Sequence, residues 1–128
     1  MRIFAAYSLI AASAAFPGAL AAYGQHPAEV QKKSAGGQHL EALVAYDKLP
    51  RRQITSAAAA AAGKSAWALS LPDRAIAEFD RALQDRELAP AERGRLLLAR
   101  GVIEYQEERY QIALLYAEKA LAVLEEPS

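Results

Sequence analysis

Apolar residues recur at helical spacing along the second half of the chain. In residues 75–83 they occupy the i, i+1, i+4, i+7 and i+8 positions that place side chains on one face of a helix. That face consists of Ala75, Ile76, Phe79, Ala82 and Leu83. The same spacing returns in residues 113–124. The pattern therefore predicts amphipathic helices and gives no support to strands.

The breaks between apolar stretches predict helices in antiparallel pairs. One clear pair covers about residues 56–85, with Ser56 as the N-terminal cap and a turn at Leu71-Pro72. The next covers about residues 90–125, with a turn at residues 108–109. A weaker pair covers residues 28–50 and ends at Pro50. We expect an all-α fold, a short α-solenoid of about three antiparallel helical hairpins.

The two clear pairs are copies of one unit. Shifting the sequence by 38 residues aligns Gly63 with Gly101, and matching small residues follow in the second helices. Glycine inside a helix costs about 1 kcal/mol, so its recurrence predicts that two helices cross closely there. The positions that define the unit are Gly63, Ala75, Phe79, Ala82, Gly101, Tyr110, Ala113 and Ala120.

These residues resemble the tetratricopeptide repeat, a helix-turn-helix unit of 34 residues with a small residue in its first helix and an A-x₃-F motif in its second. Residues 75–83 match the second-helix motif most closely. The resemblance covers residues 28–126, with a degenerate unit at 28–50 and clear units at 56–89 and 90–126. Two departures are the 38-residue period and the missing terminal proline. A generic array of helical hairpins is the alternative.

Residues 1–21 differ from the rest of the chain. Arg2 is followed by an apolar stretch from Ile3 to Phe16, and the small residues Ala19 and Ala21 follow the helix breaker Pro17-Gly18. This is the order of a secretory signal peptide, which predicts an exported protein, periplasmic or secreted. A retained membrane anchor and an ordinary buried helix are the alternatives.

Composition and charge narrow the class of partner. The chain has 128 residues, no cysteine, and 15 basic against 15 acidic residues. The absence of a basic excess argues against nucleic-acid binding, and the absence of cysteine excludes disulfides and thiolate chemistry. Charge is uneven, because residues 22–74 hold seven basic and four acidic residues and residues 75–128 hold seven and eleven. This asymmetry could steer an oriented partner or self-association.

No group of residues has the pattern of a catalytic, metal or cofactor site. His26 and His39 are thirteen residues apart and lack a helical companion at metal-ligand spacing. Glu104, Glu107 and Glu108 are interpreted as a solvated helix end rather than an acid/base pair. The sequence therefore predicts a protein that is not an enzyme and needs no metal or cofactor.

The resemblance implies that the first helices of the pairs line a concave groove that binds a peptide or protein. Trp67 and Tyr105 are the most interesting candidates, because aromatic residues dominate interface energies. The alternative is that both are core wedges between helices. The candidate partner-binding residues are Lys64, Trp67, Ala68, Arg95, Leu98, Val102, Tyr105 and Gln106.

The last predicted helix carries apolar residues on two sides, among them Leu114, Leu115 and Leu121. We expect an exposed apolar strip that docks on a partner or on a second copy of the chain. The sequence as a whole predicts an exported adaptor or assembly factor acting by protein–protein binding. One alternative is a membrane-tethered component of an envelope complex. Another is an enzyme, which is less favoured because no group of polar residues has a catalytic pattern.

Overall fold

The structure, a computed structural model, describes residues 26–125, so the predicted signal peptide at 1–21 lies outside the described residues. Throughout this part of the chain the regular secondary structure is helical. Its elements are α3 (Pro27–Ala35), α4 (His39–Asp47), a 3₁₀ turn η1 (Arg51–Gln53), α5 (Ser56–Ala68), α6 (Pro72–Leu83), α7 (Pro90–Gln106) and α8 (Tyr110–Glu125).

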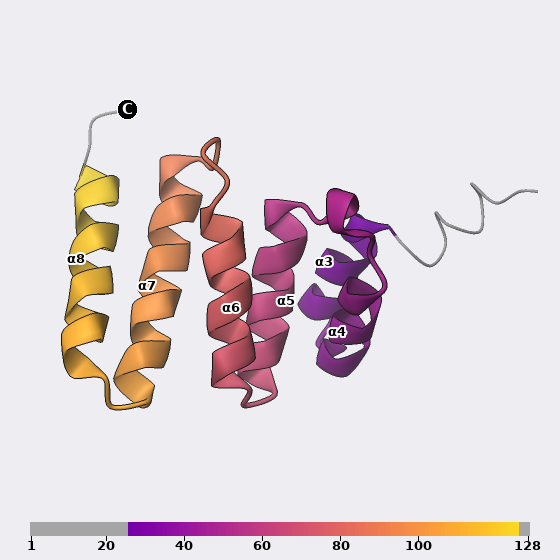
Figure 1. Cartoon of the computed structure of the whole chain (residues 1–128), viewed down its shortest axis with the longest axis horizontal. Helices are drawn as coiled ribbons and strands as arrows, with labels where there is room; N and C mark the ends of the chain where they lie inside the picture. Colours follow the sequence, from indigo (N-terminus) through magenta and orange to yellow (C-terminus); the bar gives the residue numbers. More distant parts are fainter. Residues whose placement is uncertain (1–25, 126–128) are drawn as a thin grey trace, which may run out of the picture.

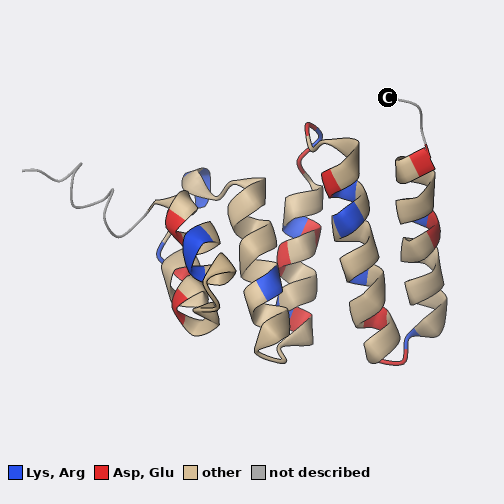
Figure 2. Ribbon diagram, turned by 180° about the vertical axis from the view of Figure 1, so that it is seen from behind, with Lys and Arg blue, Asp and Glu red and all other residues tan. Residues whose placement is uncertain are grey.

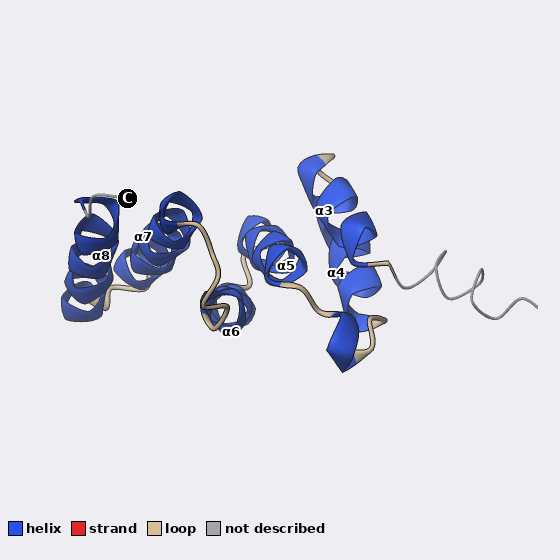
Figure 3. Cartoon of the chain, turned by 90° about the horizontal axis from the view of Figure 1, so that it is seen from above, coloured by secondary structure: helices blue, strands red, loops and turns tan. Residues whose placement is uncertain are grey.

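The helices form three hairpins in a row, α3–α4, α5–α6 and α7–α8 (Figure 1). The most extensive contacts join α7 to α8 and α5 to α6. The helices α3, α4 and α5 pack against one another, and α6 packs against α7. Seen from above, α5 and α7 lie on one side of the row and α6 lies on the other (Figure 3). The predicted all-α fold is confirmed for the described residues, and the packing of the helical hairpins fits the predicted short solenoid.

The start of α5 differs from the predicted cap. Thr55 has an extended backbone, and its hydroxyl accepts a hydrogen bond from the amide of Ala58 at 3.0 Å, as an N-cap residue does. The prediction that Ser56 caps this helix is wrong. Ser56 is the first helical residue, and its hydroxyl donates to the Asp85 carboxylate at 2.7 Å, which ties α5 to the segment after α6.

Both recurrent glycines lie where the two helices of a hairpin cross closely, as their spacing predicts. A Cβ on Gly63 would lie 2.8 Å from the ring of Phe79 on α6. A Cβ on Gly101 would lie 3.2 Å from the Ala113 carbonyl oxygen on α8. Each glycine therefore allows a contact that an alanine would crowd.

The core is built largely from small side chains. Alanines line its centre on α5, where five consecutive residues from Ala58 to Ala62 are buried. Alanine buries little area, so the few larger side chains supply much of the apolar burial. Among the fully buried residues the largest apolar ones are Phe79, Leu96, Ile103 and Val30.

Candidate functional site

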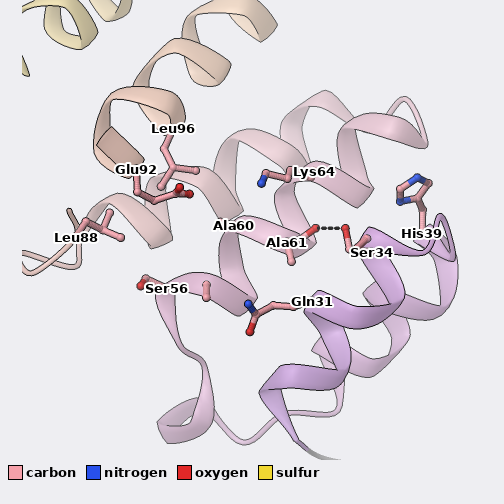
Figure 4. Close-up of a pocket in the computed structure, with 12 residues that line it drawn as sticks. Gln31, Ser34, His39, Ser56, Ala60, Ala61, Lys64, Leu88, Glu92 and Leu96 are labelled. Atoms are coloured by element: carbon pink, nitrogen blue, oxygen red, sulfur yellow. Dashed lines mark hydrogen bonds between the residues drawn. The ribbon is translucent and has the colours of Figure 1, made fainter. Parts of the chain in front are cut away.

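A groove crosses the three first helices of the hairpins, and we call it the central groove (Figure 4). Its volume is about 590 Å³. Alanines of α5 form its floor, because consecutive turns of this helix present Ala57, Ala60 and Ala61 to the same side. The complete lining is Gln31, Ser34, Ala35, His39, Ser56, Ala57, Ala60, Ala61, Lys64, Leu88, Glu92 and Leu96.

A chain of hydrogen bonds fixes one wall of the central groove to its floor. Ser34 of α3 donates to the Ala61 carbonyl oxygen at 3.1 Å, and Ser65 of α5 donates to Ser34 at 2.8 Å. His39 Nδ1 lies 2.9 Å from the Ser65 hydroxyl oxygen. Because Ser65 gives its only proton to Ser34, the consistent assignment has His39 Nδ1 donating a hydrogen bond to the Ser65 hydroxyl oxygen.

This His–Ser pair does not form a nucleophilic site. Ser65 is completely buried and its proton already points to another hydroxyl, so a substrate has no access to it. The chain of hydrogen bonds instead holds α3 and the start of α4 against α5. Its effect is to make the central groove a preformed surface.

The mouth of the central groove carries both signs of charge. Lys64 of α5 is exposed and reaches the groove from its floor, whereas Glu92 of α7 stands on the opposite wall (Figure 4). Glu92 accepts a hydrogen bond from Arg95 at 2.8 Å. A ligand lying across the groove would therefore meet a cation and an anion at separate points.

The candidate partner-binding residues predicted from the sequence do not form one surface in the structure. Lys64 lines the central groove, and Ala68 is exposed at the end of the same helix. Trp67 is half-buried, and its indole nitrogen donates to the Gln106 side chain at 3.0 Å, which links α5 to α7. Arg95 is exposed beside Glu92.

The remaining three candidates, Leu98, Val102 and Tyr105, line a second hollow that we call the end groove. It lies between α7 and α8 and has a volume of about 350 Å³. The rings of Tyr105 and Tyr110 meet edge to face at its rim, with centroids 5.3 Å apart. Its complete lining is Leu98, Gly101, Val102, Tyr105, Tyr110, Ala113, Leu114 and Ala117.

One expectation about the acidic residues is corrected. Glu104 is not part of a solvated helix end, because only 3% of its surface is exposed. Its carboxylate accepts a hydrogen bond from Arg100 at 2.6 Å and another from Arg109. Arg100 also donates to Asp80 of α6 at 2.8 Å, and its guanidinium lies over the Tyr116 ring of α8 at 4.5 Å.

These contacts determine the ionisation of the buried group. Burial alone would raise the pKa of Glu104, but hydrogen bonds and Coulombic attraction from Arg100 and Arg109 outweigh it and lower the pKa below its ordinary value. The i, i+4 spacing of Arg100 and Glu104, on the helix face that also carries Leu97, is the sequence signal that predicts this pair. The network joins α6, α7 and α8.

Sequence reasoning did not find most of the lining of the central groove. Gln31, Ser34 and His39 come from the first hairpin, Leu88 comes from the segment that joins α6 to α7, and Leu96 comes from α7. No local pattern marks them, since they converge only when the hairpins stack. Along residues 26–125 no group of three or more His, Asp or Glu side chains has the arrangement of a metal site.

No protein-family model, curated protein or solved structure matches the chain. Within the described residues, no helix combines the length and apolarity that crossing a membrane requires. A function for this protein therefore has to be inferred from the geometry of the two grooves.

Proposed function

We propose that this protein is a non-catalytic interaction module that binds a peptide segment of a partner protein in the central groove. The supporting observation is a hollow of about 590 Å³ that three successive hairpins build around an alanine floor. Grooves across stacked helices bind extended or helical segments of partner proteins. The hydrogen bonds from Ser34 and His39 hold the groove walls in place before a partner arrives, which reduces the ordering cost of binding.

The lining indicates the chemistry of the segment. Ala57 and Ala60 leave space above the floor for a bulky apolar side chain of the partner, which Leu88 and Leu96 contact from the side. Lys64 favours a carboxylate of the partner near the floor of the groove, and Glu92 disfavours one near the α7 wall. The preferred segment thus combines an apolar anchor with an acidic residue beside it.

We further propose an adaptor or assembly role of the kind for which tetratricopeptide arrays are used, in the periplasm or outside the cell. The export part of this proposal depends on residues 1–21 as a cleaved signal peptide. N-terminal sequencing of the protein isolated from its cell separates export from tethering. A chain that begins near Ala22 supports export, whereas one that begins at Met1 or Arg2 supports the membrane-tethered alternative.

Filling the central groove tests the binding proposal. Ala57→Leu adds a bulky side chain at an exposed floor position, so it blocks the groove without disturbing the core. Ala77→Leu makes the same change at an exposed position of α6 outside the groove and is the matched control. A photocrosslinking amino acid at position 64 captures the partner, and one at position 77 measures the background.

The expected result is a crosslinked protein that is specific to position 64, is lost in Ala57→Leu and persists in Ala77→Leu. Competition by a synthetic peptide with an acidic residue beside a large apolar residue gives an independent reading. Equal capture at positions 64 and 77, or undiminished capture by Ala57→Leu with an unchanged circular dichroism spectrum, would contradict the proposal.

A further inference from the structure

The end groove lies between two exposed apolar stripes with coiled-coil spacing. On α8 the apolar side chains recur at alternating steps of four and three residues, and α7 repeats that spacing in antiparallel direction. The α8 stripe is Tyr110, Leu114, Ala117, Leu121 and Leu124, and the α7 stripe is Leu98, Val102 and Tyr105. Half or more of the surface of Leu114, Leu121 and Tyr105 is exposed, at 61%, 56% and 63%.

The third hairpin differs from the first in having no further helix packed extensively against its second helix within the described residues. At the first hairpin, α5 packs against both α3 and α4. Within residues 26–125 only α7 packs extensively against α8, which forms the end of the row (Figure 1). The end groove thus presents the apolar surface against which a further helix could pack.

Charges on the two outer edges of this face are complementary to each other. Helical spacing places Arg95 on the side of α7 opposite Gly101, which faces α8, and 71% of the Arg95 side chain is exposed. Glu118 and Glu125 (red on α8 in Figure 2) are both exposed, and their spacing from the α8 stripe places them on the side of α8 opposite the buried Ala113 and Ala120. Because a Cβ on Gly94 would touch Leu124, Arg95 and Glu125 lie at the same level along the hairpin.

We propose that the occupant of the end groove is the same face of a second copy of this chain. A two-fold axis parallel to the helices places α7 of each copy over α8 of the other, in antiparallel direction. The apolar stripes then meet in a four-helix layer, as in a helical bundle. The same rotation brings Arg95 of each copy to Glu125 of the other, so one face supplies both halves of every ion pair.

The mass of the purified full chain in solution tests this proposal by light scattering or sedimentation over a concentration series. The expected mass is that of two copies, with dissociation on dilution. Leu114→Glu and Leu121→Glu each place a carboxylate inside the apolar layer and should raise the dissociation constant at least tenfold. Leu115→Glu changes an exposed leucine of the same helix outside the stripe and should leave the mass unchanged.

A charge exchange tests the orientation separately. Arg95→Glu and Glu125→Arg should each weaken the dimer by about threefold or more, and the two changes together should restore it because the pair is re-formed with reversed signs. Circular dichroism shows that the variants remain folded.

A wild-type chain that stays a single copy throughout the series would overturn the proposal and leave the face to a different protein. So would a dimer that survives Leu114→Glu, or a double charge variant no tighter than the single ones. None of these outcomes bears on the central groove, whose test uses position 57.

Discussion

Gly63 of α5 lies directly against the ring of Phe79 of α6. A Cβ built on the glycine would come within 2.8 Å of two ring carbons, and the phenylalanine is completely buried. The missing side chain of Gly63 therefore makes room for Phe79, the largest of the fully buried side chains. This pair sets how closely α5 and α6 approach each other. The floor of the central groove is also formed by α5.

Gly63→Ala should destabilise the protein although alanine is the better helix former. The added methyl group would crowd the Phe79 ring, at a cost of about 1–3 kcal/mol. The gain in helix propensity, about 1 kcal/mol, matches only the lower end of that range. Denaturant unfolding followed by the fluorescence of Trp67, the only tryptophan of the chain, measures the difference. Gly36→Ala is the control, because its Cβ would make an ordinary contact at 3.4 Å. A more stable Gly63→Ala variant would contradict this prediction.

Glu104→Gln should lower the free energy of unfolding by about 3 kcal/mol at neutral pH. The substitution leaves the buried guanidinium of Arg100 with one charged partner fewer, and an uncompensated buried charge is costly. Glu107→Gln, a change at an exposed acidic residue three positions along the chain, should have little effect. Equal effects of the two substitutions would show that the network does not stabilise the fold.

The same carboxylate predicts a pH dependence. Since the folded state lowers the pKa of Glu104, its contribution is complete above the ordinary carboxyl value of about 4.3 and is lost as the pH falls through the folded value. Wild type should therefore lose its advantage over Glu104→Gln on acidification. Urea unfolding of both proteins between neutral and strongly acidic pH measures this convergence, and a constant difference would contradict it.

Thr55→Ala should cost about 1 kcal/mol of stability, because the first turn of α5 loses the oxygen that accepts the Ala58 amide. Thr55→Ser keeps that oxygen and should retain most of the stability. Thermal unfolding by circular dichroism compares the two variants. If both variants lose the same amount of stability, the hydrogen bond from the Ala58 amide to the Thr55 hydroxyl is not the cause of the loss.

Tyr46 predicts a response at alkaline pH. Its hydroxyl donates to Glu78 at 2.6 Å, and burial first, then the Glu78 hydrogen bond and charge, raise the pKa of the phenol well above its ordinary value. The stabilisation is complete below about pH 10 and is lost as the pH rises further toward the folded pKa. Stability should therefore fall more steeply with alkaline pH in wild type than in Tyr46→Phe, and parallel urea-midpoint curves for the two proteins would contradict the assignment.

Local sequence patterns predicted the helices and their pairing, because helical periodicity, prolines at helix starts and turn residues act over a few positions. They also located the close crossings at Gly63 and Gly101. Glycine is costly in a helix interior, and that cost is offset where a neighbouring helix needs the space of the missing side chain. The cap of α5 was misplaced by one residue, because Thr55 and Ser56 are chemically equivalent candidates and only the backbone conformation distinguishes them.

The sequence by itself thus determined an array of helical hairpins with small residues at its crossings. Only the tertiary structure decided which exposed residues share a surface. It buried Glu104 between two arginines, and it separated Lys64 in the central groove from Leu98 and Tyr105 in the end groove. The physical reason is that periodicity determines which residues share one face of a helix, whereas the stacking of successive hairpins determines what that face meets.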